Sequence, residues 1–376
     1  MSFEIIEGEG ASNLSDEQKW EKLGGYLQKH GRNAFSYATL QKGMEYFIDD
    51  SMGYVAYSSV KHPIFAPKGK KIVLGDPVCS RDKVSDLTDC FLENCGEPVF
   101  TVVSESCAES LRGLDFKINS IGYEPVLDVQ NYNTKGDWKK LDAIRRARNQ
   151  ILKKDRKGKV LEEKVKITEE DVEKISRADL EKVSKSWHKG KILNKREIWI
   201  YARNPVYSQE QDVRKFFART KDGELVGYAF YDPIYEDDSV VGYSANTVRC
   251  DESNYRKLSI AINMVACEKF KDEGVKEFNL CIAPFDKTDR GKFNDHAFTS
   301  SFIKLLRRYG DRVYNFGGLS FYKGKYRAEE KQVYMASRGL IPANDLYLAF
   351  KSSDIAKSYM GVVGNLLAGM VLRKKS

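Results

Sequence analysis

The sequence predicts an α/β protein that consists of two similar units packed around a shared cleft. One pattern, a hairpin followed by a helix and a strand, occurs twice along the chain, and a strongly basic segment separates the two copies. The chain has 376 residues, of which 41% are hydrophobic, so it can bury two medium-sized cores. These observations favour two domains over one.

The first copy of the pattern begins with two segments rich in β-branched and aromatic residues, 53–60 and 71–79, which predict a hairpin. Asp76-Pro77 breaks the second of these strands. A helical segment follows at 84–95, and a strand is predicted at 98–104.

The second copy repeats this order in the C-terminal half. Segments 224–235 and 240–249 predict another hairpin, and a predicted helix at 258–274 leads to a strand at 277–285. Because both copies follow the same order of hairpin, helix and strand, a duplicated α/β unit is the economical explanation, although the copies agree in pattern more than in identity.

Between the copies lies the most basic part of the chain. Residues 139–159 include ten Lys or Arg and only two Asp. The apolar residues Leu141, Ile144, Ala147 and Ile151 recur at helical spacing, which predicts a helix with one packed face and one basic face. Such a helix suits phosphate groups, although a solvated linker helix would show the same pattern.

A second basic feature lies within an aromatic run at 314–334. If this run is a strand, Lys323 and Lys325 share one face with Phe321, whereas Tyr322 and Tyr326 line the other. A face that passes from apolar to cationic indicates a wall that leads from the core into an anion-accepting cleft. An edge strand protected by lysines is the alternative.

The overall charge also favours an anionic partner. The formal net charge is +8, which fits nucleic acid, anionic lipid or a phosphorylated substrate without choosing among them. The seven cysteines form no C-x-x-C pair and the four histidines are far apart, so we expect a reduced protein with neither disulfides nor a metal site. The N-terminus lacks the apolar core of a signal peptide.

The chain ends on an apolar segment, residues 359–372, followed by Arg-Lys-Lys-Ser. Its 14 residues fall short of the roughly 20 that a helix needs to cross a bilayer. It fits an interfacial helix that rests on anionic headgroups, and it equally fits a helix that docks on the protein's own core.

Six short motifs in a fixed order identify a family. They are L-G-D-P-V (74–78), I-R-R-A-R-N (144–149), W-H-K-G-K (187–191), T-V-R (247–249), N-L-C-I-A-P-F (279–285) and Y-N-F-G-G-L-S-F-Y-K-G-K-Y (314–326). With them the chain resembles the C-terminal catalytic domain of bacterial phosphatidylglycerol lysyltransferases, as a free-standing domain.

The resemblance implies a fold of two tandem N-acetyltransferase-like (GNAT-like) units, with a tunnel that receives aminoacyl-tRNA at one mouth and lipid at the other. It implies an aminoacyltransferase that moves an amino acid from aminoacyl-tRNA to a lipid hydroxyl, as in phosphatidylglycerol. The candidate residues are Arg249, Lys323 and Lys325 for catalysis, Asn246, Asn279, Tyr322 and Tyr326 for substrate binding, and Arg145, Arg146, Arg148, Lys153 and Lys154 for tRNA binding.

Two features concern the donor. GNAT enzymes hold the pyrophosphate of coenzyme A in a Gly-rich turn, whereas the segment after Arg249 contains no glycine and two acidic residues. We therefore expect no cofactor, with aminoacyl-tRNA as co-substrate. Asn246 stands where the lysyltransferases usually carry an aspartate, which leaves the transferred amino acid open.

The predicted organisation is an N-terminal unit (1–135), a basic linking helix (136–160), a C-terminal unit (161–350) and a membrane-interfacial helix (351–376). We expect a cytoplasmic protein that is peripheral at the inner face of the membrane. Two other functions fit the residues: aminoacylation of a peptide or small molecule, and non-catalytic binding of RNA or anionic membrane.

Overall fold

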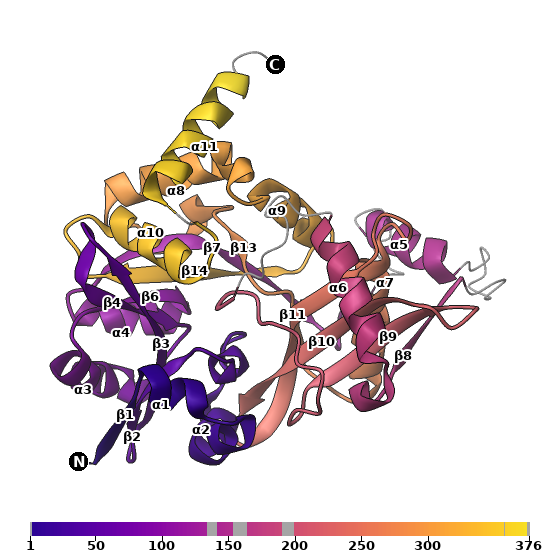
Figure 1. The fold of residues 1–376 in the computed structure, drawn as a ribbon, viewed down its shortest axis with the longest axis horizontal. Coiled ribbons are helices and arrows are strands. Elements are labelled where there is room, and N and C mark those ends of the chain that lie inside the picture. The colour runs from indigo at the N-terminus through magenta and orange to yellow at the C-terminus, as the bar shows by residue number, and fades with distance from the viewer. Residues whose placement is uncertain (1, 134–140, 153–163, 190–198, 357, 374–376) are drawn as a thin grey trace.

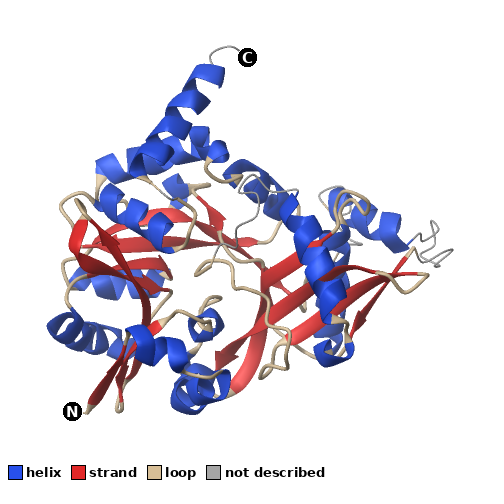
Figure 2. Ribbon diagram, viewed as in Figure 1, coloured by secondary structure: helices blue, strands red, loops and turns tan. Residues whose placement is uncertain are grey.

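The computed structural model describes residues 2–133, 141–152, 164–189, 199–356 and 358–373. Their strands form one mixed 14-stranded sheet that runs through the molecule, and helices pack against it along its length (Figure 1). Figure 2 shows the same arrangement by type of element, with the helices gathered around the sheet.

The first unit is an antiparallel meander, a helix and a strand parallel to the last strand of the meander. Its elements are β1 (Phe3–Ile6), β2 (Glu45–Asp49), β3 (Gly53–His62), β4 (Ala66–Leu74), β5 (Val78–Cys79), α3 (Val84–Cys95) and β6 (Pro98–Val103). Gly96 ends α3 with a φ of 76°, a conformation that residues with a Cβ rarely adopt, and the chain then enters β6.

The second unit repeats this arrangement. Its elements are β8 (Val165–Glu169), β9 (Arg214–Thr220), β10 (Leu225–Glu236), β11 (Ser239–Cys250), α7 (Leu258–Asp272) and β12 (Glu277–Asn279). Strands β8 to β11 are antiparallel neighbours, and β12 returns parallel to β11. The duplicated pattern of hairpin, helix and strand is therefore present in the structure.

Two long strands join the units. β7 (Lys117–Asp128) pairs with β12 of the second unit, and β14 (Glu329–Ser337) lies between β6 and β7. A strand from the C-terminal half of the chain thus completes the sheet beside the first unit. Both units share one continuous hydrogen-bonded sheet as a result.

The remaining elements cover the sheet or connect its strands. The helices are α1 (Gly8–Asn13), α2 (Asp16–His30), α4 (Glu105–Gly113), α5 (Asp142–Leu152), α6 (Arg177–Lys189), α8 (Ala297–Tyr309), α9 (Phe316–Gly324), α10 (Pro342–Ser352) and α11 (Tyr359–Arg373), with 3₁₀ turns at Tyr37–Leu40, Arg81–Lys83, Val172–Lys174, Thr288–Arg290 and Gly310–Arg312. The short strand β13 (Ala283–Pro284) pairs with β7.

The predicted basic helix is present as α5. Its apolar stripe is buried and packs in the core of the second unit, where α7 also lies; the stripe consists of Leu141, Ile144, Ala147 and Ile151. Of the predicted helix, residues 136–140 and 153–160 lie outside the described part of the chain.

The aromatic run at 314–334 does not form the single strand that we predicted. Its first part is helix α9, and a strand begins only at Glu329. Asn315 caps the helix, because its Oδ1 accepts a hydrogen bond from the backbone N–H of Gly318 at 2.9 Å. In a helix, positions 323 and 325 point to different sides, so Lys323 and Lys325 do not share a face. Phe321, expected in the core, is 72% exposed.

The C-terminal segment forms α11, which projects from the top of the molecule in Figure 1. Val362 and Leu366 of this helix are buried in the main hydrophobic core, whereas Met360 is 76% exposed. Across the described ranges, none of the helices combines the length and the apolar character that a membrane crossing requires.

Candidate active site

The candidate site lies where two parallel strands separate. β11 and β12 pair over only three residues, Gly242–Ser244 opposite Glu277–Asn279. Beyond this pairing β11 stays alongside β10, whereas the chain after β12 follows β7, with which β13 also pairs. Asn246 and Arg249 therefore lie on the β11 side of the divergence, and Cys281 lies on the β12 side.

Lys323 of α9 is anchored on the β12 side of this divergence. Its Nζ donates hydrogen bonds to the backbone carbonyl oxygens of Cys281, at 2.9 Å, and Ile282, at 2.6 Å. Cys281 has a φ of 58°, so the chain makes a local kink there, and the lysine satisfies carbonyl groups that the kink turns out of the sheet. The lysine thereby ties α9 to the sheet.

The burial of Lys323 corrects one expectation. We expected Lys323 on the wall of an anion-accepting cleft, but its side chain is only 6% exposed. Burial lowers the pKa of its ammonium group to about 8, because the charged form loses its hydration. The side chain therefore contributes to the fold as well as to the charge of the site.

Glu124 of β7 is the partner that sequence reasoning missed. Its Oε2 accepts a hydrogen bond from Nδ2 of Asn279 at 2.8 Å, and the Asn279 Oδ1 accepts one from the backbone N–H of Cys281. Its other oxygen, Oε1, is buried with no hydrogen-bond partner among the described residues. Burial raises the pKa of the Glu124 carboxyl to about 7, although the bond from Asn279 and the charge of Lys323 oppose the rise.

Glu124 and Lys323, both on the β12 side of the divergence, are electrostatically coupled, since the charge of each favours the charged form of the other. The only sequence signal for Glu124 is a glutamate within an apolar strand, I-G-Y-E-P-V-L-D.

Cys281 lies beside both groups, and burial raises the pKa of its thiol to about 12. The thiol therefore stays protonated near neutral pH and is a poor nucleophile there.

Arg249 forms a second centre on β11. Its Nη1 donates to Nε2 of His188 at 2.9 Å, so that nitrogen of the imidazole is unprotonated. The guanidinium group also lies over the ring of Trp187, 4.4 Å from the ring centroid. Lys323, the second catalytic candidate, has no bond to this centre among the described residues, and its ammonium group bonds the carbonyls of Cys281 and Ile282 on the β12 side.

Asn246 belongs to a buried ionic network. Arg203 donates to Oδ1 of Asp232 at 2.7 Å and pairs with Glu210, whose Oε2 lies 2.9 Å from Nζ of Lys215. The Asn246 Nδ2 donates to Oδ2 of Asp232 at 3.0 Å, and its Oδ1 accepts from the backbone N–H of Arg203 at 3.1 Å. An aspartate at position 246 would place a second carboxylate against Asp232, so the amide suits this environment.

Tyr322 and Tyr326, the two tyrosines predicted to bind substrate, lie away from the ionic network of Arg203 and Asp232. The hydroxyl groups of Tyr322 and Tyr326 are 3.2 Å apart, and both accept hydrogen bonds from Nδ2 of Asn263 on α7. Tyr326 is fully buried in the core of the second unit. Lys325 is half-buried, and its Nζ lies 4.7 Å from the ring centroid of Phe321.

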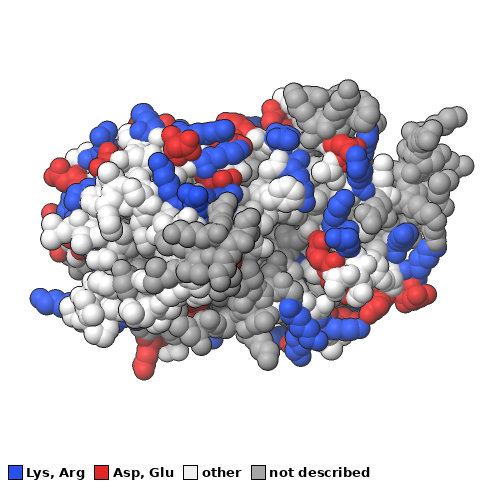
Figure 3. Space-filling model, turned by 90° about the horizontal axis from the view of Figure 1, so that it is seen from above, with Lys and Arg blue, Asp and Glu red and all other residues white. Residues whose placement is uncertain are grey.

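On α5, Arg145 and Arg146 both pair with Asp142, and the Nη2 of Arg145 lies 2.9 Å from the aspartate Oδ1. The structure does not describe the side chain of Arg148. It describes neither Lys153 nor Lys154. On the face shown in Figure 3, basic side chains are more numerous than acidic ones. Within the described residues, no group of three or more His, Cys, Asp or Glu side chains could hold a metal ion.

Comparison with known proteins places the chain in a family. A family model described as phosphatidylglycerol lysyltransferase, C-terminal, matches residues 25–337. An uncharacterized protein of Corynebacterium glutamicum is 22% identical over 350 residues, which are 92% of this chain and 42% of that protein. The phosphatidylglycerol lysyltransferase of Bacillus subtilis is 22% identical over 356 residues, 90% of this chain and 37% of that protein. The chain thus spans about two fifths of the length of these relatives.

Solved structures agree in fold. L-PGS from Bacillus licheniformis superposes with a TM-score of 0.68 at 18% identity, over 90% of this chain and 97% of that one. FemX superposes with a TM-score of 0.52 at 10% identity, over 93% of this chain and 100% of that one. The predicted α/β fold of two tandem GNAT-like units is confirmed. The chain belongs to the family of phosphatidylglycerol lysyltransferase C-terminal domains.

Proposed function

We propose that the protein transfers an amino acid from aminoacyl-tRNA to the hydroxyl group of a lipid at the cytoplasmic face of a membrane. Membership in the family supports this proposal. The observation that carries it is the buried Glu124, whose Oε1 has no hydrogen-bond partner within the described chain and lies in a site with Lys323 and Asn279. Burying a hydrogen-bond acceptor without a donor costs free energy of folding. Such a cost is expected where the oxygen is kept available for a proton of the substrate.

In the proposed reaction, the acceptor hydroxyl oxygen attacks the carbonyl carbon of the aminoacyl ester. The hydroxyl proton passes to Oε1 of Glu124, whose raised pKa matches a general base that works near neutral pH. When the bond between the carbonyl carbon and the ribose oxygen breaks, Glu124 returns the proton to the ribose oxygen. The tRNA hydroxyl and the aminoacyl lipid leave, and atoms and charge balance without a further reactant.

Lys323 supports this step electrostatically. Of the three N–H donors of its ammonium group, two bond the carbonyls of Cys281 and Ile282, and the third remains for the oxygen that becomes negative during attack. Its charge also favours the ionised form of Glu124. We assign Arg249 to the donor side, where a guanidinium group suits phosphate.

The membrane side of the proposal is supported by apolar residues that α8, α11 and the turn before α10 expose. Phe298 is 62% exposed, Met360 76% and Leu340 88%, and helices α8 and α11 lie in the upper part of the molecule in Figure 1. Viewed from above, the molecule carries a broad area with few charges, bordered by both basic and acidic side chains (Figure 3). Exposed apolar side chains on such an area suit contact with a lipid surface.

The proposal is tested by incubating the protein with tRNA charged with one labelled amino acid at a time and with vesicles of bacterial membrane lipids. We expect label from one of these tRNAs to enter the organic phase in an ester that mild alkali cleaves. If the label instead appeared on a peptide or small amine, the acceptor would not be a lipid. Consumption of acetyl-coenzyme A with no use of charged tRNA would refute the proposed donor.

A further inference from the structure

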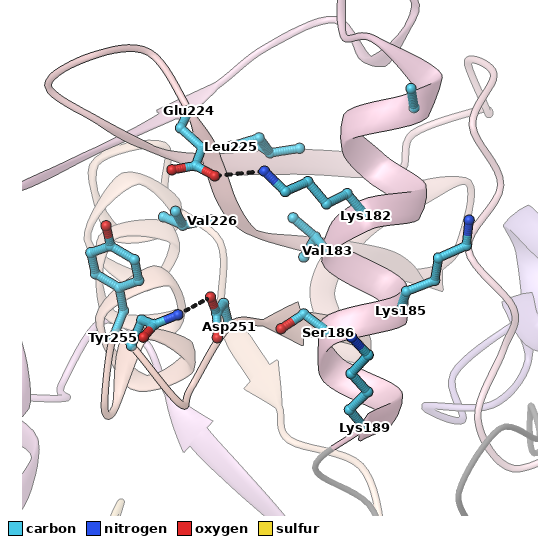
Figure 4. Close-up of a pocket in the computed structure, with 12 residues that line it drawn as sticks. Lys182, Val183, Lys185, Ser186, Lys189, Glu224, Leu225, Val226, Asp251 and Tyr255 are labelled. Carbon is cyan, nitrogen blue, oxygen red and sulfur yellow. Dashed lines mark hydrogen bonds and ion pairs between the residues drawn. The ribbon is translucent and has the colours of Figure 1, made fainter.

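The donor and the lipid need separate approaches to the proposed site. The Arg249 centre, which we assign to the donor, lies in the second unit, where α6 and the segment that joins β11 to α7 line a cavity of about 510 Å³ (Figure 4). Because the donor and the lipid occupy the proposed site together, a surface for the lipid is expected elsewhere on the molecule. The first unit carries a suitable element, which is the turn between β3 and β4.

This turn presents an apolar side chain to solvent. It consists of residues 63–65, between His62 of β3 and Ala66 of β4. Ile64 at its centre is 77% exposed, whereas the neighbouring Phe65 is half-buried and packs against the main hydrophobic core. Packing in the core thus accounts for Phe65 but leaves the apolar character of position 64 unexplained.

The turn is held in one conformation by contacts on its inner side. Nδ1 of His62 accepts hydrogen bonds from the backbone N–H groups of Ile64 and Phe65, both at 3.2 Å. The imidazole stacks on the ring of Phe65, with the centroids 4.7 Å apart, and the ring of Tyr347 on α10 meets both rings edge-on. Nζ of Lys351, also on α10, donates to a backbone carbonyl oxygen of β3. Since α10 fixes the turn, little conformational entropy is lost when Ile64 meets a partner.

Lysines flank the exposed isoleucine on both strands. Lys61 precedes Ile64 by three residues and Lys68 follows it by four, and both side chains are exposed. From residue 51 to residue 75 the chain has four lysines and no acidic residue. Within the described ranges no carboxylate lies within ion-pair distance of Lys61 or Lys68, in contrast to Lys71. Two ammonium groups near the apolar tip are therefore available to anions.

The turn lies close to the helices that expose other apolar residues. α10 packs against β3 and β4 and also against α8, and α8 packs against α11. In Figure 1, α10 accordingly lies between the two strands and the helices α8 and α11. Phe298 of α8 and Met360 of α11 are exposed. Through α10, the turn therefore adjoins the part of the molecule that we propose to contact the membrane.

The size and charge of this element favour a lipid surface over a protein partner. A specific protein interface covers about 800 Å² on each partner, which one apolar tip cannot supply. A bilayer accepts an apolar tip at the boundary between headgroups and acyl chains, and its anionic headgroups attract lysines. We propose that the β3–β4 turn is a membrane-binding element that inserts Ile64 into an anionic bilayer and holds lipid phosphates with Lys61 and Lys68. The assignment rests on the proposed function, which uses a lipid acceptor, and it names a part of the chain that meets the membrane.

Cosedimentation of the full chain with vesicles of phosphatidylcholine, with or without phosphatidylglycerol, tests the proposal. Ile64→Asp should weaken binding to the anionic vesicles about tenfold, because an apolar contact is lost and the new carboxylate is repelled by the surface. Ile5→Asp on β1 replaces another exposed isoleucine and is the matched control, which should bind like the unchanged protein. Thermal melting checks that both variants fold.

A second pair of variants tests the lysines. Lys61→Ala with Lys68→Ala should weaken binding to the anionic vesicles about tenfold, make that binding less sensitive to salt, and leave binding to pure phosphatidylcholine unchanged. Lys166→Ala with Lys174→Ala removes two exposed lysines of the second unit and is the control. It should bind the anionic vesicles nearly as well as the unchanged protein, although it lowers the net charge equally.

Equal losses in the variants and their controls, or no binding of the unchanged protein to anionic vesicles, would overturn the membrane assignment. Transfer of the amino acid to short-chain, water-soluble phosphatidylglycerol separates this assignment from the proposed function, because Ile64→Asp should retain that transfer and lose transfer to vesicles. If the unchanged protein binds vesicles through Ile64 but transfers no amino acid to either form of lipid, the proposed function is wrong and the membrane assignment stands.

Discussion

Glu124 combines burial with an oxygen that no described residue bonds. Its carboxyl has a pKa of about 7, and the coupled ammonium group of Lys323 has one of about 8. Between these two values the carboxyl of Glu124 is mainly ionised and the ammonium of Lys323 mainly charged, which is the state that a general base beside a positive charge needs.

The first prediction at this scale concerns pH. Transfer should rise as pH increases through about 7, since Glu124 must lose its proton to act as a base. It should fall as pH increases through about 8, since neutral Lys323 no longer stabilises negative charge. Single-turnover rates between pH 5.5 and 9.5, corrected for spontaneous ester hydrolysis without protein, measure this profile. A rate that rises steadily with hydroxide concentration would contradict the assignment.

The second prediction concerns stability. Lys323→Ala should lower the free energy of unfolding by about 3 kcal/mol, because it leaves two buried carbonyl groups without donors and Glu124 without its countercharge. Lys325→Ala is the matched control and should change stability by less than about 0.5 kcal/mol, because Lys325 is only half-buried and contacts an exposed ring. Denaturant unfolding of both variants measures this. Equal stability of the two would show that Lys323 does not hold α9 to the sheet.

At the scale of elements, α9 shows why a local pattern can mislead. Two apolar and then two basic residues recur at every second position from Leu319 to Lys325, which is the period of a strand. Asn315 and its bond to Gly318 instead begin a helix, in which the hydroxyls of Tyr322 and Tyr326 meet one turn apart. The cap is visible in the sequence as Asn-Phe-Gly-Gly, but its signal is weaker than that of the aromatic run.

A further prediction applies to helix α5. Arg145→Ala with Arg146→Ala should weaken tRNA binding several-fold and reduce the salt slope by about one to two, because fewer phosphates are neutralised. The apolar face of α5 stays packed, so folding should be unaffected. The control variant, Lys22→Ala with Lys83→Ala, removes two other exposed, ion-paired cations. Unchanged binding in the α5 variant would mean that Asp142 neutralises this face and that the helix is a solvated linker.

Helix α11 allows a test of membrane contact. Its buried Val362 and Leu366 dock on the core, whereas Met360 faces outward. Met360→Asp should reduce cosedimentation with vesicles that contain anionic lipid by about tenfold, because an apolar contact is replaced by a charge that the surface repels. Ile5→Asp on β1, at the other end of the molecule, is the control. Equal losses in both variants would exclude a specific role for α11.

At the scale of the whole molecule, the duplicated architecture could be predicted because each hairpin, helix and strand has its own local pattern. The way in which β7 and β14 join the two units could not be predicted from the sequence. Glu329 pairs with Val126, although about two hundred residues separate them in the sequence. No local pattern indicates that β14 lies between β6 and β7. Burial of Glu124 depends on this pairing, since it lies on β7 opposite Lys331. Asn279 and Lys323 thus come from two of the six motifs, whereas the place of Glu124 beside them follows from the topology.

The buried cluster of Glu124, Lys323 and Asn279 is the proposed reacting centre for aminoacyl transfer. Glu124→Gln tests this assignment most directly, because glutamine keeps the shape and can still accept the bond from Asn279. Single-turnover transfer from charged tRNA to lipid should fall about 10²–10⁴-fold, while tRNA binding stays unchanged and the variant melts no lower than the unchanged protein. Glu277→Gln on β12, which loses only an ion pair with Lys331, should retain near-normal transfer. Near-normal transfer in Glu124→Gln would contradict the assignment.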